Sequence, residues 1–189
     1  FFFFLFVEKM GEHPLAISNI IRSIYVVMLI PIWGFTSATN TLVSYVIGRE
    51  KTEEVISIVF KVLKLGVICT LGLVFLNLII PEKVLSVYTN NVLLIEDSLP
   101  ALYVVSVAAI FLTMGFILFS GVSGTGMTKI SFAIETFVIF IYIGITYLLV
   151  NMNNTKIEYV WMVEIFYSII IGTLSLLYLR LGNWKHKRI

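Results

Sequence analysis

Two carboxylates, Glu135 and Glu164, lie inside long apolar stretches of the sequence. A lone charge at the centre of a bilayer costs about 2.5–3.5 kcal/mol on insertion scales, so such a group usually faces a cavity, pairs with a base, or binds a proton or cation. Three interpretations stay open for these two residues: structural ion pairs, a proton or cation role for at least one, and simple snorkelling to the membrane surface.

Basic residues are expected at the same depths as these acids. Lys61 and Lys64 lie at the inner level of Glu135, and Arg22 lies near the outer level of Glu164, when depth is counted along the apolar spans. These three bases are therefore the candidate counter-charges, and ion pairing is the alternative to an ion-binding role.

Each carboxylate also belongs to a polar helix face. Ser131, Glu135, Tyr142 and Thr146 recur at near-helical intervals, as do Trp161, Glu164, Ser168 and Ser175. Such faces could line a cavity that holds an amphipathic organic cation through aromatic contact and charge, or they could seal a helix bundle. The candidate ion or substrate residues are Glu135, Glu164, Asn40, Trp33, Tyr142 and Ser168.

A glycine-containing stretch, FSGVSGTGMTKISFAIE at 119–135, comes close to a phosphate-binding loop. That loop needs Lys directly after its second glycine, but Met127 follows Gly126 here, and apolar spans lie on both sides. We expect a hinge between two helices. With no nucleophile constellation or metal cluster in the sequence, we expect neither an enzyme, nor a metal, nor an organic cofactor.

Composition indicates a membrane protein. Hydrophobic residues make up 59% of the 189 residues and charged residues 13%, against about 25% charged in ordinary soluble domains. The net charge of +2 and the absence of a basic stripe argue against a nucleic-acid partner. The lipid bilayer is the expected surrounding.

Five apolar segments are each long enough to cross a hydrocarbon core as a helix, which needs about 20 residues. They lie at roughly 15–47, 55–80, 99–121, 130–150 and 158–180. The opening run FFFFLFV is interpreted as the end of a sixth helix, cut from a longer parent. The sequence thus predicts an all-α membrane protein with one transmembrane domain over 1–189. Pro31, inside the first long segment, predicts a kink or tilt.

Lysine and arginine are distributed unequally between the two sides. This asymmetry places the C-terminus in the cytoplasm, with 182–189 as a basic tail, and we expect a plasma membrane, the inner membrane of a bacterium. The inner set is Arg49, Lys51, Lys61, Lys64, Lys129, Arg180, Lys185, Lys187 and Arg188; the outer set is Lys9, Arg22, Lys83 and Lys156.

Three stretches, PIWGFTSATNTLVSYVIGREKTEEV, SGVSGTGMTK and GNWK, resemble the C-terminal half of a multidrug and toxic compound extrusion (MATE) transporter. The resemblance implies two six-helix lobes that face each other across a central cavity, with this chain forming most of one lobe. The partner would be the N-terminal lobe of the same parent. It also implies export of small organic cations, driven by inward movement of Na⁺ or H⁺ through alternating access.

The chain departs from the family pattern in two places. Ser123 precedes Gly124 and Met127 follows Gly126, where relatives often have Arg-Gly and Gly-Asp pairs, and 112–114 reads Leu-Thr-Met where some members carry an acid. The coupling carboxylate is therefore expected at Glu135, at Glu164, or in the other lobe. The alternatives are a lipid-linked saccharide flippase of the same superfamily and a membrane assembly or anchoring subunit that transports nothing.

Overall fold

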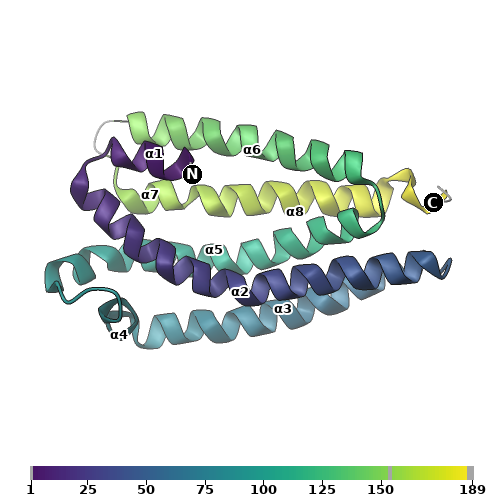
Figure 1. Ribbon diagram of the computed structural model, residues 1–189, viewed down its shortest axis with the longest axis horizontal. Helices are drawn as coiled ribbons and strands as arrows, with labels where there is room; N and C mark the ends of the chain where they lie inside the picture. Colours follow the sequence, from purple (N-terminus) through teal and green to yellow (C-terminus); the bar gives the residue numbers. More distant parts are fainter. Residues whose placement is uncertain (1, 153–154, 187–189) are drawn as a thin grey trace.

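The chain folds into long helices that run side by side in a computed structural model, which describes residues 2–152 and 155–186 (Figure 1). The helices are α1 Phe2–Glu8, α2 Glu12–Gly48, α3 Glu54–Ile79, α4 Pro81–Ser86, α5 Val92–Gly124, α6 Thr128–Asn151, α7 Ile157–Trp161 and α8 Val163–Leu181, followed by the 3₁₀ turn η1 Asn183–His186. Within these described ranges no strand is present. The all-α fold predicted from the sequence is confirmed.

Among the residues that the structure describes, five helical stretches are long and apolar enough to cross a membrane: α2, α3, α5, α6 and the run Ile157–Leu181 that joins α7 to α8. They coincide with the five predicted spans. The opening run FFFFLFV lies in α1 apart from Phe1, which is outside the described residues.

Helix α5 is the centre of the lobe. It packs on α2, α3 and α8, and 56% of its most apolar 18-residue window is buried, against 11% for α6. Two glycines bring α5 and α8 together: a Cβ at Gly172 would lie 3.2 Å from the Gly115 Cα. Small residues at such a crossing let helix backbones approach closely, which is how membrane helices gain packing energy. The lobe thus has a close-packed centre and a loosely covered edge at α6.

Helix α2 is continuous through its proline. It runs from Glu12 to Gly48 with Pro31 near its middle, and Figure 1 shows the helix changing direction midway. The Thr36 hydroxyl donates to the Ile32 carbonyl at 2.7 Å, one turn after the proline. Proline cannot donate to the carbonyl one turn before it, so a bend here has an identifiable cause.

The glycine-containing stretch is a helix-to-helix turn, as predicted. Gly126 has a φ of +77°, a conformation that favours glycine, and it lies between the end of α5 and the start of α6. A Cβ at Gly124 would lie 2.9 Å from the Asn40 carbonyl oxygen, and the Ser44 hydroxyl donates to the Gly124 carbonyl at 3.1 Å. The turn is thus packed directly on α2.

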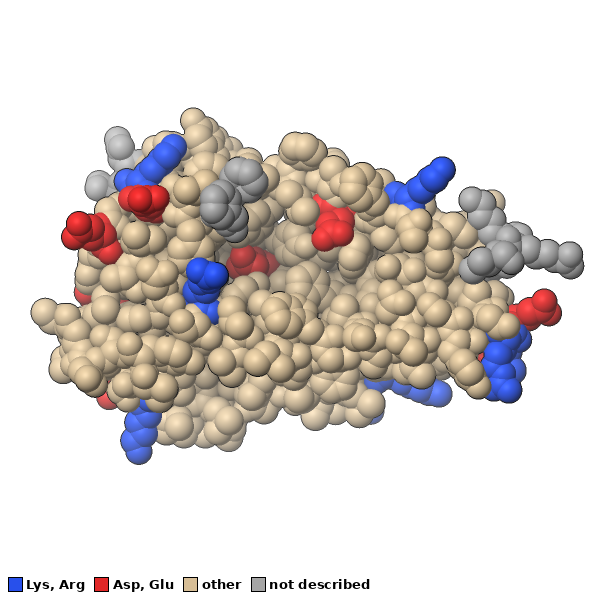
Figure 2. Space-filling view, viewed as in Figure 1, with Lys and Arg blue, Asp and Glu red and all other residues tan. Residues whose placement is uncertain are grey.

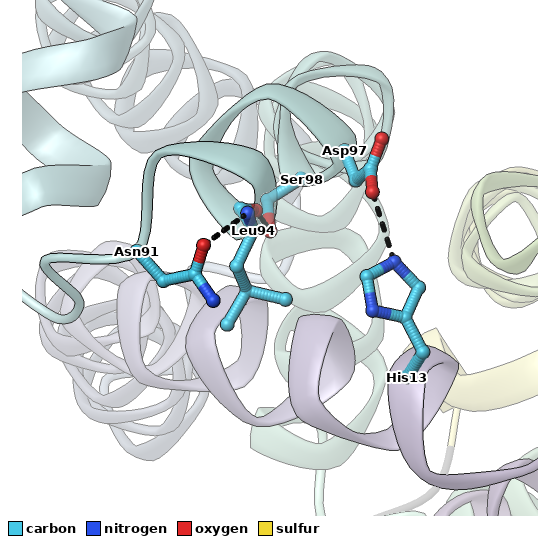
Figure 3. Close-up of polar contacts among 5 residues, drawn as sticks. All are labelled: His13, Asn91, Leu94, Asp97 and Ser98. Carbon is cyan, nitrogen blue, oxygen red and sulfur yellow. Dashed lines mark hydrogen bonds and ion pairs between the residues drawn. The ribbon is translucent and has the colours of Figure 1, made fainter.

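A polar link joins α2 and α5 near their N-terminal ends, at the opposite end of the lobe (Figure 3). His13 Nε2 lies 2.9 Å from Asp97 Oδ2, and both side chains are more than half exposed. Asn91 begins α5 by accepting a hydrogen bond from the Leu94 amide at 3.4 Å. An exposed pair of this kind contributes about 0–1 kcal/mol, so this link orients the helix ends more than it stabilises the fold.

The predicted basic tail at 182–189 lies only partly within the described residues, which end at His186. Trp184 in η1 is buried, and its Nε1 donates to the Leu179 carbonyl at 3.0 Å. This end of the chain is therefore fastened to the last turns of α8.

Gly115→Ala should destabilise the lobe by about 1–3 kcal/mol, because the new Cβ would lie 2.7 Å from the Ser168 carbonyl oxygen, an atom fixed in the α8 backbone. Thermal unfolding of the full-length protein in detergent measures this effect. Gly144→Ala is the matched control, since a Cβ there meets nothing within 4 Å. Equal melting temperatures for the two variants would contradict the close α5–α8 packing.

Candidate functional site

The carboxylate of Glu164 is held by two tyrosine hydroxyls from different helices. Tyr25 on α2 donates to Glu164 Oε2 at 2.8 Å, and Tyr142 on α6 donates to Oε1 at 2.8 Å. Hydrogen bonds to an ionised acceptor are roughly twice as strong as bonds between neutral groups. Each carboxylate oxygen thus has its own donor, although no base pairs with the group among the described residues.

This arrangement connects helices that otherwise have little contact. Helix α2 packs mainly on α5 and α3, whereas α6 packs mainly on α8. The link from Tyr25 through Glu164 to Tyr142 therefore ties α2 to α6 across the face between them, with α8 supplying the central acceptor.

Glu164 lies where two pockets meet. The larger pocket has a volume of about 610 Å³ and the smaller one about 310 Å³, and both include Phe3, Tyr142 and Glu164 in their walls. Figure 2 shows the face of the lobe hollowed here, with acidic side chains in and beside the hollow. The larger pocket also contains Arg22 and Glu8.

Aromatic rings surround the carboxylate and support one another. Tyr142 and Tyr167 pack edge to face with ring centres 5.7 Å apart, and Tyr25 does the same with Trp161 at 5.7 Å. The Trp161 Nε1 donates to the Ser18 hydroxyl at 3.3 Å, which fixes the indole against α2. Ring faces beside a carboxylate form a surface that attracts an organic cation by both its charge and its apolar parts.

Among the predicted ion or substrate residues, the structure brings only Glu164 and Tyr142 together at the pockets. Ser168 is buried one turn below, where its hydroxyl donates to the Glu164 backbone carbonyl at 2.5 Å, outside both pocket walls. Trp33 is 53% exposed on α2, and Asn40 is half-buried near the α5–α6 turn. Neither Trp33 nor Asn40 lines a described pocket.

Glu135 does not pair with Lys61 or Lys64. The acid is exposed on α6 and takes part in none of the described ion pairs, and the two lysines are exposed on α3. Figure 1 places α6 and α3 at opposite edges of the lobe, with α5 and α8 between them. Equal depth in the membrane fixes the level of a residue but not the side of the bundle on which it lies, and these candidate counter-charges do not meet Glu135 in the structure.

Arg22 shares the larger pocket with Glu164 but does not pair with it. Its guanidinium lies over the Phe4 ring, 5.0 Å from the ring centre, while the two carboxylate oxygens accept from tyrosines instead. The predicted depth of Arg22 is consistent with its place in the pocket. The ion pair, one of the interpretations left open by the sequence, is not formed in the structure.

Sequence reasoning missed Tyr25, Tyr167 and Phe3. An aromatic residue in an apolar helix is usually a packing residue, so none of the three carries a signal by itself. Tyr25 follows Arg22 by three residues, a spacing that places both on one helix face, and this relation was the available clue.

Tyr25→Phe and Tyr142→Phe should each lower stability by about 1.5–3 kcal/mol, because each removes a donor from a charged and largely enclosed oxygen. Thermal unfolding of the full-length protein with each variant in the wild-type and Glu164→Gln backgrounds forms a double-mutant cycle. The loss of stability from each Tyr→Phe change should be smaller in the Glu164→Gln background than in the wild type, so the two losses should not add. Tyr103→Phe is the control, since the Tyr103 hydroxyl makes no hydrogen bond to a described residue. Full additivity with Glu164→Gln would contradict the two-tyrosine site.

Comparisons with known proteins support the fold. The family model MatE matches residues 1–148, which is most of the chain. A crystal structure described as MATE in complex with MaL6 superposes with a TM-score of 0.84 at 19% identity, and the match covers 95% of this chain and 42% of that chain. The chain thus spans less than half the length of that structure, and no curated protein matches its sequence. The chain belongs to the MatE family, that of the multidrug and toxic compound extrusion (MATE) transporters.

Proposed function

We propose that this chain is one lobe of a secondary active exporter that exchanges an organic cation for Na⁺ or H⁺ by alternating access. The observation that carries the proposal is the Glu164 carboxylate, which has two tyrosine donors, no basic partner among the described residues, and a position where two aromatic pockets meet. A negative charge without a basic partner at membrane depth is a site that a cation or proton can occupy.

Either coupling ion would change the link between α2 and α6. The carboxylate oxygens would coordinate a bound Na⁺, and the phenol oxygens of Tyr25 and Tyr142 could act as further ligands, since hard cations prefer oxygen. A bound proton would turn one acceptor oxygen into a donor, so the tyrosine that donates to that oxygen must rotate or release it. Occupancy of Glu164 thus alters which hydrogen bonds hold the two helices together.

This change can drive alternating access. An ion shifts the equilibrium between two conformations only when it binds them with different affinity. Because the hydrogen bonds of Glu164 join α2 to α6, a conformation that separates these helices would offer the ion a different set of ligands. An organic cation that needs the same oxygens would compete with the ion, and such competition gives exchange.

The pocket walls favour an organic cation over a lipid-linked sugar phosphate. The larger pocket, at about 610 Å³, falls in the size range of drug-sized ligand sites. Its charged lining consists of Glu8, Glu164 and Arg22 among the described residues, which is not the strongly basic surface that a diphosphate would need. The flippase and the non-transporting anchor remain as the other outcomes of the experiment below.

The expected partners follow from this function: the N-terminal lobe of the same parent, the bilayer, and a small organic cation. We place the parent in the plasma membrane, the inner membrane of a bacterium, with the C-terminus in the cytoplasm. This placement rests on the unequal distribution of Lys and Arg in the sequence.

Glu164→Gln in the full-length parent should abolish gradient-driven export of an organic cation, because the amide keeps the shape but loses the charge that the ion and substrate share. Efflux of a fluorescent cation such as ethidium from proteoliposomes, under a Na⁺ or a pH gradient, measures this. Glu96→Gln is the matched control: Glu96 is an exposed acid on α5 outside both pockets, and its loss should leave efflux unchanged.

Glu135→Gln tests the second predicted carboxylate, which lies exposed on α6 and takes part in no described ion pair. If Glu164→Gln and Glu135→Gln both leave gradient-driven efflux intact, neither predicted carboxylate couples the ion to export. Translocation of a lipid headgroup without cation efflux would support the flippase, and neither activity in the wild-type protein would support the anchor.

A further inference from the structure

The larger pocket contains a positive and a negative side chain that face the same space without pairing. Arg22 and Glu164 both line it, but Glu164 accepts from Tyr25 and Tyr142, and Arg22 lies over Phe4. The described ion pairs include neither residue. Arg22 is exposed and Glu164 is half-buried, so solvent weakens the attraction between them, and the guanidinium stays available to a ligand that enters the pocket.

We propose that Arg22 is a specificity-determining residue that makes this pocket select ligands carrying both charges, an amine at one end and a carboxylate at the other, joined by an aromatic body. This inference deepens the proposed export function and rests on it for the role of Glu164. The amine lies against Glu164, and the carboxylate of the ligand lies against Arg22.

The opposite charges of Arg22 and Glu164 in the pocket wall favour a ligand that itself carries two opposite charges. A simple cation bound at Glu164 would also lie in the field of the Arg22 guanidinium, and that repulsion would weaken its binding. A carboxylate on the ligand turns the same guanidinium into a partner. Glu8 also lines the pocket, but it is exposed and is not paired with Arg22, so the guanidinium remains available.

The geometry of Arg22 suits carboxylate recognition. A guanidinium is planar and presents several N–H groups around its edge, which match the two oxygens of a carboxylate. When its face lies over a ring, as over Phe4 at 5.0 Å, the N–H groups at the edge stay free to donate. The ring fixes the plane of the group, so less conformational entropy is lost on binding.

The walls between the two charges suit an aromatic body. Phe3 packs on Trp161 with ring centres 4.7 Å apart, and Trp161 packs on Tyr25 at 5.7 Å. All three rings line the larger pocket together with Glu164. Phe3 and Trp161 are buried and support the wall from behind, while the half-buried rings of Tyr25 and Phe4 offer a surface to a flat aromatic ligand. A flexible aliphatic amino acid would gain less from that surface and lose more entropy.

The test measures ligand binding by the full-length parent in nanodiscs, with calorimetry. The probes are para-(aminomethyl)benzoate, which carries both charges, and its methyl ester, which carries only the positive one, together with the biphenyl homologue of each to cover a longer span. The wild-type protein should bind the better-fitting zwitterion about tenfold more tightly than its ester. Arg22→Gln should remove this preference and bind the ester at least as well as the wild type does.

Two further variants separate charge from packing. Arg22→Lys should keep part of the preference because it keeps the positive charge, and Arg180→Gln, a change at an exposed arginine in the last turn of α8, should leave it intact. An equal loss of affinity for both ligands in Arg22→Gln, or an unchanged zwitterion preference, would overturn the proposal. No zwitterion preference in the wild type would overturn it as well.

The outcome is independent of the transport assay. A zwitterion preference that depends on Arg22, found in a protein without gradient-driven efflux, would support this inference and defeat the proposed function. Conversely, gradient-driven efflux of ethidium that Arg22→Gln leaves unchanged, with no zwitterion preference in the binding assay, would support the function and defeat this inference.

Discussion

The structure of this site depends on how a carboxylate is satisfied at membrane depth without a base. Glu164 cannot leave its oxygens bare in a low-dielectric interior, because an unsatisfied charged group there costs several kcal/mol. Two tyrosine hydroxyls meet that need and keep the negative charge in place. An arginine in the same position would have neutralised the carboxylate and closed the site. Hydroxyls are also reversible partners, since they can donate to a carboxylate and accept from a carboxylic acid.

The packing of the lobe divides it into a firm part and a lightly held part. Helix α5 is fixed against α2, α3 and α8, with glycine contacts to α8 and a buried hydroxyl pair, Thr70 and Thr113, 2.7 Å apart, to α3. Helix α6 packs chiefly on α8 and carries little buried surface. In the proposed mechanism α6 is the element that responds to Glu164, because few other contacts hold it to α2. The hydrogen bonds of Glu164 therefore have a large influence on the position of α6, because packing contributes little to holding α6 against α2.

The sequence predicted the fold more fully than the site, for a physical reason. Hydrophobic length determines which segments span a bilayer, so all five spans and the turn at Gly126 could be predicted. Depth could also be counted, which put Arg22 at the level of Glu164. The side of the bundle on which a residue lies could not be predicted in this way, and α3 and α6 lie at opposite edges of the lobe. Tyr25 was missed because only the folded lobe brings its hydroxyl to α8.

The same distinction explains why Arg22 and Glu164 share a pocket without forming a bond. Arg22 is directed along α2 towards the ring of Phe4, and its packing there follows from the short segment α1 lying against α2. Glu164 accepts a hydrogen bond from the hydroxyl of Tyr25, which lies one turn after Arg22 on α2. Phe4 and Tyr25 therefore keep the two charges apart, and a direct salt bridge would require both contacts to be given up. The pocket therefore keeps a guanidinium without an acidic partner and a carboxylate without a basic partner among the described ion pairs. A ligand that pairs with both charges binds more tightly than one that pairs with either alone.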